Sequence, residues 1–134
     1  MKPVIFGDAE AATIQFLKAH VPTPYTYSTD FPESESKTPH IVVRRYGGNY
    51  KQRAIDYARF SIEAWSTDRA LAQDAIQEVI GWLHVANHKN YVSFDGIVLA
   101  RVFVESAPQY FPDKASGEHR WISTVAVYCR PKSA

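Results

Sequence analysis

The sequence has little cysteine, little net charge and no long apolar run. Cys129 is the one cysteine among 134 residues, so an intrachain disulfide is excluded. Fifteen lysine and arginine residues against fourteen acidic ones leave a net charge of +1, which argues against binding nucleic acid mainly through phosphates. No stretch approaches membrane-spanning length, and the run in MKPVIFGDAE is too short for a signal peptide. We expect no membrane contact, no export, and a buried, unreactive thiol.

The residues that are present predict one globular domain. Hydrophobic residues make up 46% and charged residues 22% of the chain, which is ordinary for a folded domain of this length. Two segments have helical patterns. GDAEAATIQFLKAHVP has Asp8 as a candidate N-cap and ends before Pro22. STDRALAQDAIQEVIGWLHVAN is the stronger segment, with a wide apolar stripe of Leu71, Ala72, Ala75, Ile76, Val79, Leu83 and Ala86.

Four segments have the pattern of strands. HIVVRRY is followed by residues 54–65, in which Ala58, Phe60, Ile62 and Ala64 alternate with a wetter set ending in Glu63 and Trp65. GIVLARVFVES and HRWISTVAVYCR are rich in β-branched and aromatic residues. Residues 23–39 are expected to be a loop with at most a brief strand at 25–27, and APQYFPDKASGE a long turn; we predict mobile loops near 28–39 and 107–118.

These elements predict an α+β domain in the order α-β-β-α-β-β. Because the strand pairs have hairpin-type connections, a mostly antiparallel or mixed sheet of about four strands is expected, with the helices packed on one face. The glycine pair in RRYGGNYKQR is not a phosphate-binding loop, since no Lys-Ser/Thr and no helix follow it. It also lacks the spacing of a KH clamp. A flexible hairpin tip is the prediction, because glycine readily adopts positive φ.

The residues that could carry chemistry do not form a convincing catalytic or metal site. His84 and His88 are four residues apart near a helix end, but no glutamate follows the first and no third ligand is evident. No Gly-x-Ser-x-Gly elbow occurs. The paired carboxylates Asp68 with Asp74, and Glu33 with Glu35, are explained by solvation. We predict no enzyme activity, no cofactor and no metal.

Basic and aromatic residues gather in and around the predicted hairpin. A solvated tip, a nucleic-acid contact and a protein interface all fit this composition, and the near-neutral charge favours protein. Asp56 and Arg59 are three apart on a strand, so they face opposite sides and each must pair elsewhere or across a subunit boundary. The candidate subunit-interface or lumen residues are Arg44, Arg45, Tyr46, Tyr50, Lys51, Arg53, Asp56 and Arg59.

An ordered set of motifs covers residues 8–130. DAEAATIQFLKAHVP is followed by VVRRYGGN, then RAIDYARFSIEAWSTDRALAQDAIQEVIGWL, and finally PDKASGEHRWISTVAVYCR. The most telling parts are Arg-x-x-Asp-x-Ala-Arg at 53–59, the following Glu-Ala-Trp, and the closing Ser-Gly-x-x-Arg. Each is weak alone, but their order resembles the tail terminator (tail completion) proteins of long-tailed, siphovirus-type bacteriophages.

The resemblance implies a structural virion protein at the head–tail junction, assembled in the host cytoplasm. Such proteins form a homo-oligomeric ring, typically a hexamer, that ends polymerisation of the tail tube protein and meets a head-completion or connector protein. DNA would pass through the lumen without specific binding. The implied fold is a small α+β sheet with helices on one side. Two alternatives stay open: another head–tail connector or completion protein, and a small nucleic-acid-binding module using the hairpin at 44–53.

Overall fold

A computed structural model describes residues 3–51, 54–87, 91–93 and 96–132. The chain is a single α+β domain with helices α1 (Ala9–His20) and α2 (Arg69–Val85). A six-stranded mixed sheet has the order β1-β2-β3-β6-β5-β4, in which only the β1–β2 pair is parallel. Its strands are β1 (Thr26–Ser28), β2 (His40–Lys51), β3 (Ile55–Ser66), β4 (Tyr91–Val92), β5 (Val98–Tyr110) and β6 (His119–Arg130).

The predicted class is confirmed, but the expected strand number is too low. The four long strands are β2, β3, β5 and β6, and the two additional strands lie at the sheet edges. β1 has three residues and β4 has two, which is too short for a period-of-two pattern to reveal. β1 overlaps the brief strand expected at 25–27, whereas β4 was not expected.

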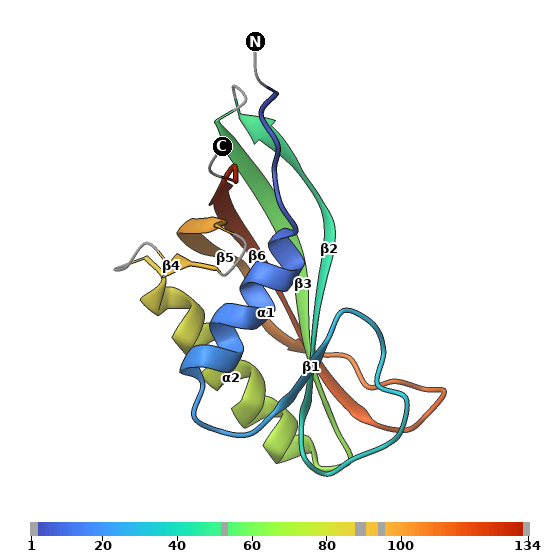
Figure 1. Cartoon of the computed structure of the whole chain (residues 1–134). Coiled ribbons are helices and arrows are strands. Elements are labelled where there is room, and N and C mark those ends of the chain that lie inside the picture. Colours follow the sequence, from blue (N-terminus) through green and yellow to red (C-terminus); the bar gives the residue numbers. More distant parts are fainter. Residues whose placement is uncertain (1–2, 52–53, 88–90, 94–95, 133–134) are drawn as a thin grey trace.

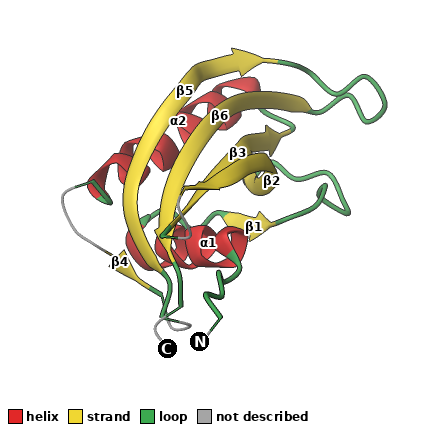
Figure 2. Ribbon diagram, turned by 90° about the horizontal axis from the view of Figure 1, so that it is seen from above, coloured by secondary structure: helices red, strands yellow, loops and turns green. Residues whose placement is uncertain are grey.

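The sheet curls into a half-barrel, and both helices pack on the same face (Figures 1 and 2). That face supplies the core. Ala58, Phe60, Ile62 and Ala64 of β3 have no exposed surface, as predicted from their alternation. From α2, the fully buried set is Ala72, Ala75, Ile76, Val79 and Leu83. We call the opposite side of the sheet the open face.

Local signals set the helix starts. Asp8 caps α1 by accepting a hydrogen bond of 3.0 Å from the Ala11 N–H. Asp68 caps α2 by accepting from the Ala70 and Leu71 N–H groups at 3.0 and 3.1 Å. Aspartate suits both places because its carboxylate satisfies amides that have no partner within the helix and also favours the positive end of the dipole. None of the described helices is long and apolar enough to cross a membrane.

At one end of the open face, the side chains are more buried than the alternation predicted. Glu63 and Trp65 are 4% exposed, although their positions belong to the predicted wet face. The loop between β1 and β2 covers this end, with the Phe31 ring 5.7 Å from the Trp65 ring. The Trp65 indole N–H donates to the Glu63 carboxylate at 2.9 Å, so the buried acid has a partner.

One predicted boundary, the end of β5, also needs correction. β5 continues through Tyr110, so the turn expected from residue 107 begins at Phe111. Irregular register with β6, between Val104 and Gln109, lets the strand continue through a segment that contains Pro108. The strand and the turn are therefore present as predicted, but the predicted end of the strand is wrong.

The glycine pair lies inside β2, not at the hairpin tip. The register of β2 with β3 shifts between Arg45 and Gly47, and the connection to β3 comes only after Lys51. Gly48 has a φ of 113°, and a Cβ there would overlap the Tyr57 carbonyl oxygen. The expected positive φ is confirmed at Gly48, but its purpose is a close backbone approach at a β-bulge.

Candidate interaction surface on the open face

The predicted interface residues divide between the two faces of the sheet. Arg45, Tyr50 and Asp56 lie on the helix side: Asp56 alternates in step with the core positions of β3, Tyr50 is paired with Asp56, and Arg45 is paired with the core residue Phe60. Arg44, Tyr46, Lys51 and Arg59 belong to the open face. Arg53 lies outside the described residues. The described members of this set therefore do not share one face of the sheet, and their role at a subunit interface or lumen stays a prediction.

Arg45 and Asp56 form an intrachain ion pair. Arg45 Nη1 donates to Asp56 Oδ2 and Nη2 donates to Oδ1, each at 2.6 Å. The same guanidinium donates from Nε to the Gly47 carbonyl at 3.0 Å, across the bulge. Hydrogen bonding to Asp56 raises the pKa of Arg45. Asp56 is 1% exposed, so this pair secures the fold and is not free to bind a partner.

Tyr50 packs against the N-terminal segment. Its ring stacks on Phe6 with centroids 4.4 Å apart and planes 10° from parallel. The neighbouring Ile5 carbonyl accepts a hydrogen bond of 3.0 Å from the Lys132 N–H, which joins the two terminal segments at this end of the sheet (Figure 1). Tyr50 stays 63% exposed, so part of its ring remains available at the surface.

Arg59 forms an ion pair with Glu105, which lies on β5 and not in the predicted hairpin. Its Nε and Nη2 donate to Oε1 and Oε2 of Glu105, each at 2.9 Å. The Tyr57 hydroxyl donates to the same carboxylate at 3.4 Å. The guanidinium lies 5.4 Å from the centre of the Tyr46 ring. Glu105 raises the pKa of Arg59, so the arginine is cationic and paired. The prediction that Asp56 and Arg59 pair elsewhere is confirmed, within one chain.

Aromatic rings continue this surface toward β5. Tyr57 and Tyr128 meet edge to face at 4.7 Å, and Tyr128 lies 5.3 Å from Phe103. Lys51 Nζ donates to the Tyr128 hydroxyl at 3.3 Å and lies 5.0 Å from the centre of the Tyr57 ring. We call this set the open-face patch: Tyr46, Lys51, Tyr57, Arg59, Phe103, Glu105 and Tyr128.

The open-face patch has the composition of a protein interface. Phe103 is 45% and Tyr46 50% exposed, and arginine and tyrosine are the residues that anchor such interfaces. Arg45 and Arg59 already bind carboxylates, which makes them weaker phosphate ligands than the sequence suggested. Sequence reasoning missed Phe103 and Glu105 on β5 and Tyr128 on β6, because only the strand order of the folded sheet brings β6, and β5 beyond it, beside β3. The alternation within GIVLARVFVES was the one available signal.

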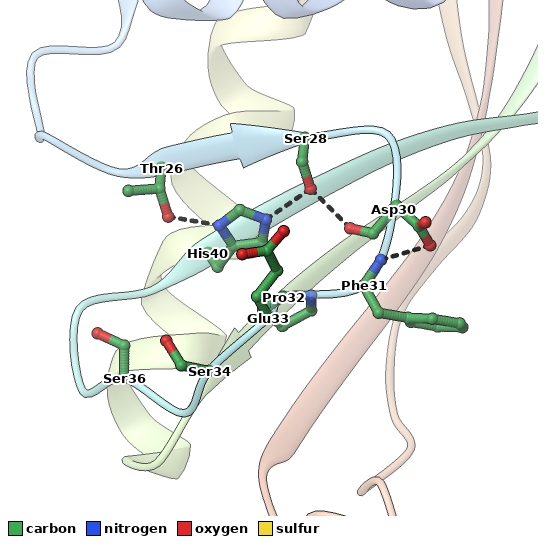
Figure 3. Close-up of a pocket in the computed structure, with 9 residues that line it drawn as sticks. All are labelled: Thr26, Ser28, Asp30, Phe31, Pro32, Glu33, Ser34, Ser36 and His40. Carbon is green, nitrogen blue, oxygen red and sulfur yellow. Dashed lines mark hydrogen bonds between the residues drawn. The ribbon is translucent and has the colours of Figure 1, made fainter.

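A second polar cluster lies where β1 meets β2 (Figure 3). The two nitrogens of His40 contact the hydroxyls of Thr26 and Ser28, the latter at 2.7 Å from Nε2. The Ser28 hydroxyl donates to the Asp30 carbonyl at 2.6 Å, so it must accept from the ring Nε2–H. Burial lowers the pKa of His40, which favours a neutral ring whose Nδ1 accepts from Thr26.

This arrangement is a structural clip. A serine beside a histidine suggests a nucleophile and its base, but the Ser28 proton points to a carbonyl and not to the ring. The three side chains fasten β1 and the following loop to β2. The Thr-x-Ser spacing on one strand and a histidine at the start of the next was the signal that the sequence offered. His84 lies in the last turn of α2, and His88 is outside the described residues.

Comparison with known proteins concerns the whole domain. No protein-family model and no curated protein sequence matches the chain. Among solved structures, a chain of one described as the virion of a native gene transfer agent (GTA) particle aligns with a TM-score of 0.57 at 14% identity. The alignment covers 91% of this chain and 94% of that chain. The two chains share a fold. At 14% identity, the alignment shows that the two chains have the same architecture but says nothing about the role of any individual residue.

Proposed function

We propose that the protein is a structural virion component, a tail terminator of a long-tailed phage-like particle. In this role it forms a homohexameric ring on the head-proximal end of the tail tube, stops polymerisation of the tube protein and presents a surface to the head connector. The main support is the alignment over nearly the full length of both chains with a protein of a GTA virion. The ordered motif resemblance over residues 8–130 adds the finer assignment.

The physical features of the domain suit ring assembly. A closed ring of identical subunits needs two different patches on each subunit, which meet head to tail. The open-face patch, together with the loops at the far end of the sheet, offers two such regions. A net charge of +1 suits a lumen through which DNA passes without being held. The role is structural and requires no catalytic residue, cofactor or metal.

The first test is the mass of the purified protein by native mass spectrometry at several concentrations. We expect a hexamer, either free or after addition of tail tubes assembled from the tube protein of the same particle. Electron microscopy then measures whether added protein caps tubes and limits their length. A protein that stays monomeric, leaves tube length unchanged and is absent from purified particles would contradict the proposal.

A head-completion or connector ring is the second candidate within the same particle. It is favoured by the same structural match, whose description names the virion and not a position in it. Immunogold labelling of isolated tails and isolated heads separates the two roles, since a terminator stays with tails and a connector with heads. Arg45 is a poor position for testing either role, because its substitution disrupts the buried ion pair with Asp56.

A further inference from the structure

Among the described residues, three cations are exposed at one end of the sheet, whereas the loop at 29–39, at the other end, exposes three carboxylates and one lysine, Lys37. Lys51, Arg101 and Arg130 are exposed at the end where β2 stops, β5 begins and β6 stops. Among the described residues, no carboxylate lies within salt-bridge distance of these three cations. Figure 1 shows this end beside the chain termini, while the turns before β2 and β6 lie at the opposite end.

A shallow hollow of about 550 Å³ lies at the basic end. Its apolar lining includes Ile55, Ala100 and the half-exposed ring of Phe103, with Tyr128 beside them. Arg101 and Arg130 also line it, and their side chains are exposed. We call this the basic hollow. It combines an apolar floor with two cations at its edge, which suits an aromatic side chain flanked by carboxylates.

The acidic loop, residues 29–39, presents such a group at the other end. Asp30, Glu33 and Glu35 are exposed, and no described cation lies within salt-bridge distance of them. Phe31 directly follows Asp30 and is 53% exposed, and its ring points away from the Glu33 side chain (Figure 3). The negative charge of this loop also acts on Glu118. Burial raises the pKa of Glu118, and the charge of Glu35 raises it further.

The acidic loop is attached to the domain at several points. The Ser28 hydroxyl holds the Asp30 carbonyl, and the Thr67 N–H donates to the Ser36 carbonyl at 3.0 Å. The Ser66 hydroxyl donates to the Lys37 carbonyl at 2.6 Å. The Arg44 guanidinium lies 4.5 Å from the centre of the Phe31 ring. A segment held in this way loses less conformational entropy on docking than a free one.

We propose that the acidic loop of one copy of this chain docks into the basic hollow of a second copy. Phe31 would contact Phe103 and Tyr128, while Glu33 and Glu35 would face Arg101 and Arg130. Charge complementarity selects a second copy as the occupant. Because the two surfaces lie at opposite ends of one sheet, they cannot meet within a chain. Such a contact is head to tail, and its repetition gives a ring where the rotation between copies closes and an open filament where it does not. The docking contact itself does not depend on the proposed function; only the number of subunits in the ring does.

Cysteine cross-linking tests the contact directly. Glu33→Cys and Arg101→Cys proteins are mixed and oxidised mildly, and disulfide-linked dimer is measured by non-reducing gel and mass spectrometry. Cys129 does not interfere, because it is 2% exposed. We expect the mixed pair to cross-link at least about tenfold faster than Glu33→Cys mixed with Asp74→Cys, a control on the exposed side of α2. Equal rates for the two pairs would overturn the docking.

Charge reversal supplies a second, independent test. Glu33→Lys/Glu35→Lys has a basic loop and a basic hollow, whereas Arg101→Glu/Arg130→Glu has both acidic. Each protein alone should lose self-association at least about tenfold. Their equimolar mixture should restore it with alternating subunits, and so should the fourfold variant by itself. Lys18→Glu/Asp74→Lys, on exposed helix positions, should assemble like the wild type. Circular dichroism confirms that each variant is folded.

The outcomes separate docking from function. Rings that form and cap tubes with both reversed variants would overturn the docking and leave the tail terminator role standing. Cross-linking at 33–101 without any capping of tubes would support the docking and contradict that role. Loss of duplex-DNA binding in Arg101→Glu/Arg130→Glu, with self-association intact, would overturn the docking by making nucleic acid the occupant of the basic hollow.

Discussion

Arg45 and Asp56 meet through two parallel hydrogen bonds of 2.6 Å across the β2–β3 hairpin, directly beside the β-bulge. The carboxylate is buried, whereas the arginine side chain is 28% exposed. Glu10 of α1 accepts from the Arg45 N–H at 2.7 Å, so the same residue also joins the hairpin to the first helix. Asp56 is paired in register with Tyr50, which stacks on Phe6, so the ion pair lies near the N-terminal segment.

Removing the cation from this pair should be strongly destabilising. Arg45→Met leaves a buried carboxylate without its partner, and the expected loss is about 3–5 kcal/mol in the free energy of unfolding. Arg45→Met combined with Asp56→Leu should lose less, because no buried charge remains. Urea denaturation measures both. Arg59→Met is the matched control on the exposed pair with Glu105, and a loss there equal to that of Arg45→Met would contradict the distinction.

Substitution by alanine should destabilise the protein far more at Gly48 than at Gly47. Gly48→Ala is expected to cost more than about 2 kcal/mol, because it combines positive-φ strain with overlap against the Tyr57 carbonyl. At Gly47 an added Cβ meets no atom within 4 Å, and the change should stay within about 1 kcal/mol of the wild type. Thermal and urea unfolding measure the difference. Equal losses in the free energy of unfolding at the two positions would contradict the requirement for glycine at position 48.

The clip at His40 should make stability depend on pH. Burial lowers its pKa below the ordinary value of 6.5, so the unfolded chain binds a proton at a higher pH than the folded one. Stability from this residue is complete above pH 6.5 and is lost as the pH falls from there toward the folded pKa. Urea midpoints between pH 8 and 5 should fall less steeply for His40→Gln than for the wild type. Parallel curves would contradict the assignment.

The thiol of Cys129 should be inert in the folded protein. Burial raises its pKa to about 12, with the charge of Asp56 contributing, so almost no thiolate is present at neutral pH. A chromogenic disulfide reagent should react with it only as fast as the domain unfolds, and rapidly in urea. Asp74→Cys supplies an exposed thiol for comparison. Equal reaction rates of the two thiols in native protein would contradict this prediction.

Features that depend on residues near in sequence could be predicted from the sequence alone. The helix starts follow from Asp8 and Asp68, since an N-cap acts within one turn. The buried face of β3 follows from its alternation, because successive side chains point to opposite sides of a sheet. The α+β class follows from the order of these elements. That the protein forms a ring, and that the loops at 28–39 and 107–118 are mobile, stay predictions.

Only the tertiary structure decided which charges meet and which surface remains open. Arg59 lies 46 positions before Glu105, and nothing local in either strand specifies that partner. The burial of Trp65 on the side predicted to be wet depends on a loop that returns over the sheet. Period-of-two patterns describe one strand at a time, whereas pairing register and loop coverage depend on the whole chain. The basic hollow, and the placement of the acidic loop at the opposite end of the sheet, are therefore properties of the fold.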